Sequence, residues 1–296
     1  MKSLLLAVLL ITISLEANYP KNVTCKGCHT VIYEEFNDSQ HRKSSIYEDS
    51  IHKAAWDNHT DKKNKSYTCA KCHTPTDTKL LKNLDEKKIA LPKKIKIQTE
   101  EAISCAYCHS IKEIKKHEGI STNEMNKKSK FFYSANKSKR KLSEVKYEDE
   151  KYLFGMVKEK NGSPFHKLDY TNKNYYDGNV CMGCHAELKN SENLELFKIK
   201  KASAKDEKTN CITCHMPKIK GTTTTIKKTK EHRFHGFAGA RFKQELLSKY
   251  VKIKFQPSKE FFNISIKNEA SHEMFIHPLR VAALKVEIFR DNKIIK

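Results

Sequence analysis

Apolar and polar residues alternate over the last part of the chain. A period of two predicts β-strands, because successive side chains of a strand point to opposite faces. Pro257 and the Asp291–Asn292 pair mark breaks between the alternating runs. We therefore expect residues 241–296 to form a short β segment. The apolar positions are Val251, Ile253 and Phe255, then Phe262, Ile264 and Ile266, then Leu284, Val286 and Ile288.

A different pattern opens the chain. Lys2 precedes an apolar stretch from Leu4 to Leu15 that has only two polar interruptions. This stretch is shorter than the roughly 20 apolar residues that cross a bilayer, and Ala17 offers a small residue for cleavage. We predict a signal peptide over residues 1–17, with an uncleaved N-terminal anchor as the alternative. The mature protein is then exported, and we expect it to be soluble in the periplasm.

The apolar content of the chain is low for its length. Of 296 residues, 38% are hydrophobic, and the mean hydropathy is −0.71. The length suggests about two domains, and the small numbers of Gly and Pro exclude a collagen-like or Pro/Gly-rich chain. A core made of side chains alone would be thin, so we expect something other than side chains to fill part of the interior.

All ten cysteines fall into five identical C-x-x-C-H units, and none is left over. This unit is the attachment signature of c-type haem: two thiols three positions apart form thioethers with the two vinyl groups, and the adjacent His binds the iron as proximal ligand. We therefore expect five covalently bound haem c groups. The units are Cys25, Cys28, His29; Cys69, Cys72, His73; Cys105, Cys108, His109; Cys181, Cys184, His185; and Cys211, Cys214, His215.

Other uses of ten cysteines fit the pattern poorly. Five disulfides in an exported protein would not place a His after every second Cys. Structural zinc takes cysteine pairs two at a time, and five pairs is an odd number. A thioredoxin-like redox pair does not require the following His either. The haem interpretation therefore explains all five units together.

Nine further histidines could supply the sixth ligand of the irons. Five irons need at most five of them, and the rest are expected to be ordinary surface residues. Met182 and Met216 are weaker candidates, because each lies too close to its own motif to reach across readily. The nine are His41, His52, His59, His117, His166, His232, His235, His272 and His277.

Four segments each combine a C-x-x-C-H unit with one of these histidines. In order and type they resemble the cytochrome c-552/c-554 type multihaem c-type cytochrome family, and together they span residues 24 to about 240. The resemblance implies His41, His117, His166 and His232 as distal iron ligands, with His235 as a close rival of His232. The segments are TCKGCHTVIYEEFNDSQH (24–41), SCAYCHSIKEIKKH (104–117), SPFHKLDYTNKNYYDGNVCMGCH (163–185) and NCITCHMPKIKGTTTTIKKTKEHRFHG (210–236).

The C-terminal segment resembles the start of the β-sandwich-like region of some multihaem relatives. The matching residues are Ser271, His272, Pro278 and Arg280, which implies His272 as the fifth distal ligand. Because the alternation runs to the last residues, we expect the chain to be shorter than its relatives, with an unpaired sheet edge.

The fold class follows from these features. We expect a mainly α chain with extensive coil wrapped around covalently bound haems, plus the short C-terminal sandwich-like β segment. Residues 18–240 would form the pentahaem domain. Within it, residues 18–120 carry three motifs with short amphipathic helices between them. Residues 121–165 form a charged connector of solvated helix or loop, and residues 166–240 carry two motifs.

The charge of the chain is strongly positive. There are 57 Lys+Arg against 35 Asp+Glu, a formal net charge of +22, from which the propionates of five haems would subtract about ten. The lysines are scattered, which is typical of a solvated surface, and no nucleic-acid-binding module is present. The alternative is steering toward an acidic redox partner or an anionic substrate.

Three functions are compatible with this sequence. The favoured one is an electron carrier that takes electrons from a membrane quinol-oxidising protein or another cytochrome and passes them to a periplasmic reductase during anaerobic respiration. The alternative is an oxidoreductase in which one open haem acts on a small nitrogen or sulfur compound, with His52, His59, His235 or His277 as proton donor. The third is a haem-bearing sensor or subunit that docks through its β segment.

Overall fold

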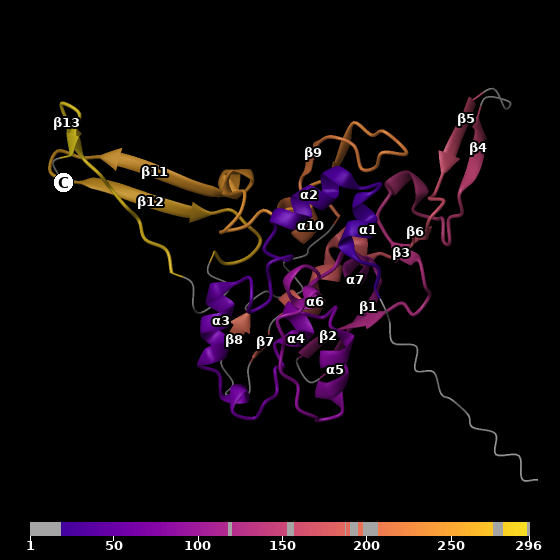
Figure 1. Cartoon of the computed structure of the whole chain (residues 1–296). Helices are drawn as coiled ribbons and strands as arrows, with labels where there is room; N and C mark the ends of the chain where they lie inside the picture. The colour runs from indigo at the N-terminus through magenta and orange to yellow at the C-terminus, as the bar shows by residue number, and fades with distance from the viewer. Residues whose placement is uncertain are drawn as a thin grey trace, which may run out of the picture. The chain divides into compact units, whose positions relative to one another are not determined.

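The computed structural model of the chain is shown in Figure 1. Contacts between residues divide the chain into two units. The first unit contains Met1–Ser110, Lys127–Ser129 and Gly221–Lys230, and the second contains Ile111–Asn126, Lys130–Lys220 and Glu231–Lys296. The described residues are 19–117, 120–152, 157–186, 188–189, 195–197, 207–274 and 281–294.

The predicted signal peptide over residues 1–17 lies outside the described residues. Among the helices that are described, none combines the length and the apolar character needed to cross a membrane. The domain boundaries expected at residues 18–240 and 241–296 stay a prediction.

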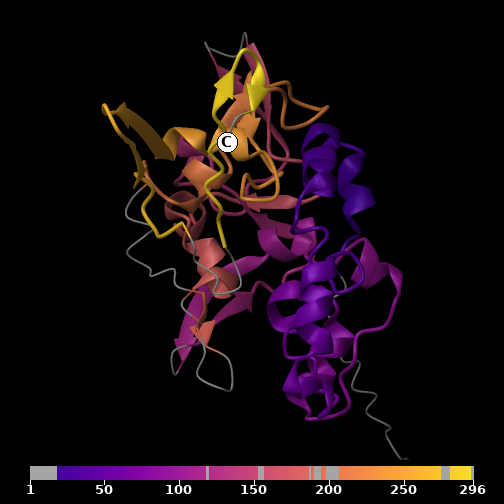
Figure 2. The same cartoon turned by 90° about the vertical axis from the view of Figure 1, so that its left-hand side faces the viewer.

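Short helices joined by coil build the first unit, as its indigo and purple ribbon shows in Figure 2. Side chains that precede a helix fix several of its start points: Asp49 accepts hydrogen bonds from two backbone N–H groups of α3, and Asp77 accepts one from α5. The expectation of short helices is therefore confirmed here. The helices are α1 (Asn22–Lys26), α2 (Thr30–Asp38), α3 (Ser50–Asp57), η1 (Thr60–Lys62), α4 (Ala70–His73), α5 (Thr78–Asp85), α6 (Lys96–Thr99) and α7 (Cys105–His109).

A small apolar cluster supports the second cysteine motif of this unit. Trp56 and Tyr67 pack edge to face, with ring centres 4.9 Å apart. Ala70, within the motif itself, is fully buried beside them. The remaining members are Ile46, Leu80 and Ala90. Six residues make a modest core, as the composition led us to expect.

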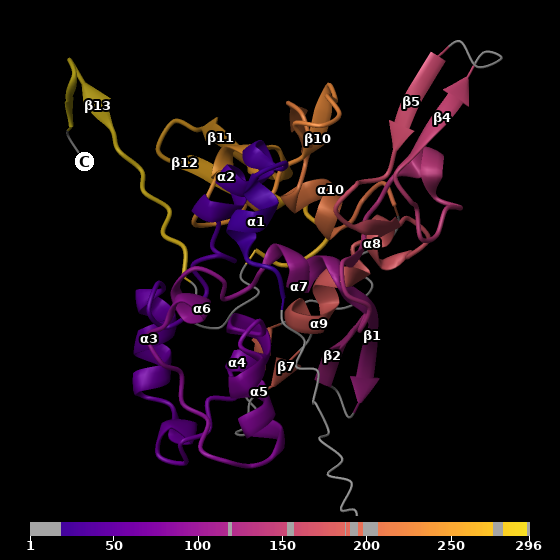
Figure 3. The same cartoon turned by 45° about the vertical axis from the view of Figure 1, so that its right-hand side comes forward.

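The second unit contains more strand than the sequence suggested. The connector expected as solvated helix or loop forms hairpins instead, among them β4 with β5, which lie side by side in Figure 3. The expectation of a mainly α chain is therefore correct only in part. The pairs are β1 (Ile111–His117) with β2 (Ile120–Met125), β3 (Phe131–Tyr133) with β6 (Lys167–Asp169), β4 (Glu148–Tyr152) with β5 (Val157–Asn161), β7 (Leu188–Lys189) with β8 (Glu195–Phe197), and β9 (Lys218–Lys220) with β10 (Glu231–Arg233).

The helices of the second unit are as short as those of the first. Three of them, η3, α9 and α10, carry residues of cysteine motifs, and the others are single turns. They are η2 (Lys137–Lys139), α8 (Asn174–Asp177), η3 (Asn179–Cys181), α9 (Met182–His185), α10 (Cys211–His215), η5 (Gln244–Leu246) and η6 (Ser248–Tyr250).

Two hairpins end the described chain. The first two alternating runs are confirmed, because β11 (Val251–Pro257) pairs antiparallel with β12 (Phe262–Asn268). The strand predicted for the third run is wrong. Residues 284–288 have no regular structure, since no strand lies beside them in the described ranges. A smaller hairpin of β13 (Phe289–Arg290) and β14 (Lys293–Ile294) follows.

The break predicted at Asp291 and Asn292 is confirmed as the turn of this smaller hairpin. Both residues have positive φ, at 50° and 62°, as a two-residue type I′ turn requires. Each hairpin remains a sheet of two strands. The sandwich expected for residues 241–296 is therefore not confirmed.

The β11–β12 hairpin is expected to open readily in solution. Its apolar face is largely exposed, with Ile253 63% and Phe255 59% accessible, and an isolated two-stranded hairpin is marginally stable in water. Backbone amides of β11 and β12 should exchange with deuterium at least about tenfold faster than those of α5, which packs on the buried cluster. Equal protection of the hairpin and α5 in exchange mass spectrometry would contradict this expectation.

Candidate functional site

Four of the five C-x-x-C-H motifs lie on helices of about one turn, and the first runs from α1 into the turn before α2. The two cysteines and the histidine occupy positions i, i+3 and i+4, which share one face of a helix. Three side chains that must reach one planar group are therefore presented on the same side. The motifs occupy the α1–α2 junction, α4 with its N-terminal Cys69, α7, η3 with α9, and α10.

Residues just before two motifs determine where these helices begin. The Ser104 hydroxyl accepts a hydrogen bond from the Tyr107 N–H at the start of α7. The Asn210 side chain accepts from the N–H groups of Ile212 and Thr213 at the start of α10. Both are polar N-cap residues placed directly ahead of the first cysteine.

Backbone carbonyls orient three of the proximal histidines. The Nδ1–H groups of His29, His73 and His215 donate to the carbonyls of Thr223, Ser44 and Ala238, at 2.9, 3.2 and 2.6 Å. A carbonyl can only accept, so each proton is fixed on Nδ1 and Nε2 becomes the ligating nitrogen. Burial also lowers the pKa of His215, which favours the neutral ring that a metal requires. These residues fit the haem predicted from the sequence.

The first and third motifs meet inside the first unit. The thiols of Cys25 and Cys105 are hydrogen-bonded to each other, and this bond lowers the pKa of Cys25 and raises that of Cys105. Asn22 fixes the arrangement, because its Oδ1 accepts from the Cys105 N–H at 2.8 Å and its side-chain amide donates to the Glu100 carbonyl at 3.2 Å. These two sulfurs would hold the groups attached to them close to each other.

The fourth and fifth motifs meet in the same way inside the second unit. A hydrogen bond from Cys181 lowers the pKa of Cys211 to about 7. Gly178, with φ of 78°, makes the tight turn before the fourth motif, and a Cβ there would lie 3.1 Å from the Cys211 backbone nitrogen. Asn210 links the two segments, since its side-chain amide donates to the Tyr176 carbonyl at 3.0 Å.

The spacing of His272 and His215 fits a metal between them. Their ring centres are 6.0 Å apart, and the ring planes differ by 11°. Two imidazoles that bind one metal from opposite sides, each at a metal–nitrogen distance of about 2 Å, have centres about 6 Å apart. The Nδ1–H of His272 donates to the Glu273 carbonyl at 2.7 Å, which again leaves Nε2 as the nitrogen that could bind a metal.

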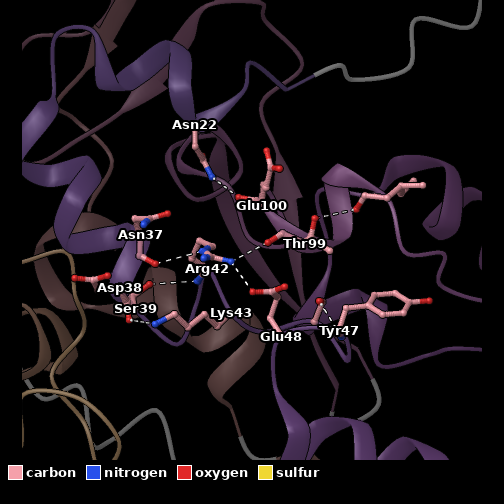
Figure 4. Close-up of polar contacts among 12 residues, drawn as sticks. Asn22, Asn37, Asp38, Ser39, Arg42, Lys43, Tyr47, Glu48, Thr99 and Glu100 are labelled. Carbon is pink, nitrogen blue, oxygen red and sulfur yellow. Dashed lines mark hydrogen bonds and ion pairs between the residues drawn. The ribbon is translucent and has the colours of Figure 1, made fainter.

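A hydrogen-bond network around Arg42 holds the segment that carries His41 (Figure 4). Arg42 donates to the carbonyls of Asn37 and Thr99, at 3.2 and 2.8 Å, and pairs with the Glu48 carboxylate at 2.8 Å. The neighbouring Ser39 is fully buried. His41 is thereby fixed in a partly buried position of the first unit.

The other candidate distal ligands are His232, His166, His117 and His277, and two of them have described side chains. His232 is buried on β10, and His166 is partly buried with its ring edge-to-face with Phe132 at 5.3 Å. His117 ends β1, but its side chain lies outside the described residues, as does all of His277.

Two spare histidines have local backbone partners. The Nδ1–H of His235 donates to the Arg233 carbonyl at 2.6 Å. The Nδ1 of His59 accepts from the Asp61 N–H at 3.1 Å, and its ring stacks on Trp56.

Sequence reasoning left the role of His52 open, and the structure places it behind the second motif. The Ser44 carbonyl accepts from Nδ1–H of both His52 and His73, at 2.9 and 3.2 Å, and the two ring centres are 3.9 Å apart. The buried Tyr67 hydroxyl donates to Nε2 of His52 at 3.2 Å. His52 thus lies on the Nδ1 side of His73, and it supports that ring rather than facing it across an iron. Its spacing of 21 residues from His73 gave no signal of this contact.

The midpoint potential of the haem at the second motif is expected to fall when His52 is replaced by Leu. The Ser44 carbonyl then accepts from His73 alone, and a stronger Nδ1–H bond makes the ring a more basic ligand that favours ferric iron. We expect about a tenfold change in the ratio of oxidised to reduced haem, or about 59 mV for one electron. Spectroelectrochemical titration measures it.

The matched variant Tyr67→Phe keeps the His52–Ser44 bond and is expected to shift the same potential less. A midpoint potential that rises in His52→Leu, or that shifts equally in both variants, would contradict the proposed sharing of the Ser44 carbonyl between His52 and His73.

None of the ten cysteines, all of which lie in the described residues, forms a disulfide. Within the described ranges, no three metal-binding side chains converge on one point.

Comparisons with known proteins bear on the whole arrangement. Residues 24–110, which contain the first three motifs, match the family described as cytochrome c554 and c-prime. No curated protein sequence matches the chain. In fold, the chain is similar to the crystal structure of a penta-haem cytochrome c552 from Thermochromatium tepidum, with a TM-score of 0.60 and 20% identity. The likeness covers 88% of this chain and 68% of that one.

The family match and the fold similarity agree with the haem attachment that the C-x-x-C-H motifs predict. The family match falls on the part of the chain where the first and third motifs meet, and the fold likeness extends over both units. A c-type cytochrome holds its haem covalently through the thioethers that C-x-x-C-H provides. Residues 24–110 therefore resemble this multihaem cytochrome family in sequence, and the chain as a whole resembles a penta-haem cytochrome in fold.

Proposed function

We propose that the chain holds five haem c groups and conducts electrons between redox proteins. The observation that carries the proposal is the pairing of motifs, Cys25 with Cys105 and Cys181 with Cys211. The two cysteines of each pair would hold two different haems close to each other. Closely spaced haems exchange electrons and need no substrate pocket.

In this proposal the ten motif cysteines form the thioethers, and the five motif histidines are the proximal ligands. His272 is the distal ligand opposite His215, which the spacing of 6.0 Å supports. His41, His117, His166 and His232 complete the other irons. With two strong ligands at each iron, no coordination position is left for a substrate.

The proposed setting is the periplasm, after export by the predicted signal peptide. The partners would be a membrane quinol-oxidising protein or another cytochrome as donor, and a periplasmic reductase as acceptor. The excess of 57 Lys+Arg over 35 Asp+Glu supports acidic partners.

Electron paramagnetic resonance of the oxidised protein, followed by addition of CO to the reduced protein, tests the proposal. Intact mass spectrometry first counts the haems, and five are expected. Each haem should give a low-spin signal, and CO should leave the reduced spectrum unchanged. A haem that is high-spin and binds CO would overturn the proposal. It would favour an oxidoreductase acting on a small nitrogen or sulfur compound.

A further inference from the structure

A compact loop of the first unit, residues 221–230, covers the first motif. The Gly221 N–H donates to the Lys230 carbonyl at 3.0 Å and closes the loop at its base. Gly221 has φ of 135°, a conformation that side chains resist. Threonine hydroxyls bond the loop to itself: Thr229 accepts from the Thr223 N–H at 3.0 Å, and Thr224 accepts from the Lys227 N–H at 2.9 Å. The loop is thus a built structure with a defined outer surface.

Two hydrogen bonds attach this loop to the first motif. Its Thr223 carbonyl accepts the Nδ1–H of His29 at 2.9 Å, and its Thr225 N–H donates to the Cys28 carbonyl at 2.8 Å. The loop backbone therefore touches both the proximal histidine and the residue that precedes it. A molecule seated on the loop would be one hydrogen bond away from a proximal ligand.

The outer surface of the loop is basic with an apolar centre. Lys227, Lys228 and Lys230 are exposed, and Ile226 between them is 45% accessible. Residues 221–230 contain no Asp or Glu. In the adjoining helices, Glu34 is ion-paired with Lys26 at 2.7 Å.

We propose that the 221–230 loop is the docking surface for an acidic redox protein, which exchanges electrons with the haem of the first motif through Thr223 and His29. The inference rests on the proposed function as an electron carrier. Lysines around a small apolar contact give fast, steered and short-lived association, which electron exchange between proteins needs. The electron passes from the reduced partner to ferric iron, or in the reverse direction, with no bond made or broken.

The test uses the haem-loaded protein and a reduced plant-type ferredoxin, a small acidic electron donor, in anaerobic stopped-flow experiments. The variant Lys227→Glu/Lys228→Glu is expected to lower the second-order rate constant at low ionic strength by about tenfold or more. At about 1 M salt, where charges are screened within about 3 Å, its rate constant should approach that of the unchanged protein. Reduction by dithionite, and the midpoint potentials, should be unaltered.

The matched control is Lys252→Glu/Lys254→Glu on β11, where both lysines are exposed. It changes the net charge by the same amount and should retain most of the rate. Lys227→Arg/Lys228→Arg keeps the charge of the loop and should retain the rate as well. Equal losses in the loop and β11 variants would mean that total charge, and not the loop, attracts the partner, which would overturn the inference.

A loop variant whose second-order rate constant at low salt equals that of the unchanged protein would also overturn the inference about the docking surface. Failure of the proposed electron-carrier function gives a different result. The unchanged protein would then contain an open haem that binds CO, whatever the loop variants do. If the loop variants do not change the rate of electron exchange with ferredoxin and every haem is low-spin, only the docking-surface inference fails.

Discussion

A chain produced without haem attachment is expected to be largely unfolded. Its buried apolar residues form small clusters, such as the six around Trp56 and Tyr67 and the three around Phe131, and its sheets have two strands each in the described residues. Such clusters alone cannot offset the conformational entropy of a chain of 296 residues. The free energy of binding the prosthetic groups must supply most of the stability, as in metal-coupled folding.

Far-UV circular dichroism of a variant with all ten motif cysteines replaced by Ser measures this. We expect it to lack most of the helical signal and to show no cooperative thermal transition. The matched control is Cys211→Ser/Cys214→Ser, which should lose one haem by mass and keep most of the native spectrum. A native-like spectrum and a cooperative melt in the haem-free chain would contradict the expectation.

Replacing His272 by Ala is expected to open one haem and leave the others unchanged. The ring centres of His272 and His215 are 6.0 Å apart. In the proposed function, the loss of His272 therefore removes the sixth ligand of the iron at the fifth motif. One of five low-spin signals should become high-spin, and the reduced protein should then bind one equivalent of CO. Imidazole added to the buffer should restore the low-spin spectrum by filling the vacant position.

His59→Ala is the matched control for this variant, because the His59 ring stacks on Trp56 and its Nδ1 accepts from the Asp61 backbone. It should leave every haem low-spin. A His272→Ala protein whose spectrum stays fully low-spin would show that another residue binds this iron. His235 would then be the first residue to replace by Ala.

The structure departs from the sequence patterns where a partner far along the chain decides the outcome. Leu284, Val286 and Ile288 alternate as a strand does, yet they are not in one, because a strand forms only where another backbone completes its hydrogen bonds. The polar connector forms hairpins such as β4 with β5 for the converse reason: each strand has an adjacent partner. Local pattern predicts β11 and β12 correctly because they are neighbours joined by a short turn.

The site divides in the same way. Spacing alone predicts the five haem-attachment units, because thioether chemistry needs two thiols and a histidine within five consecutive residues. The distal ligands are separated from their motifs by tens of residues, so the sequence could only offer candidates. It could not single out His52 either, since that contact depends on the Ser44 carbonyl lying between two rings.

The sequence by itself determined the chemistry of this protein: covalent haem attachment, the number of attachment motifs and a polar chain that cannot bury much apolar surface. These properties follow from residue type and from spacing within a single helical turn. Only the tertiary structure decided which motifs meet. Cys25 reaches Cys105, and Asn22 caps that contact, across about eighty residues of chain. Such contacts depend on how separate short helices pack, and the local pattern of residues does not encode that packing.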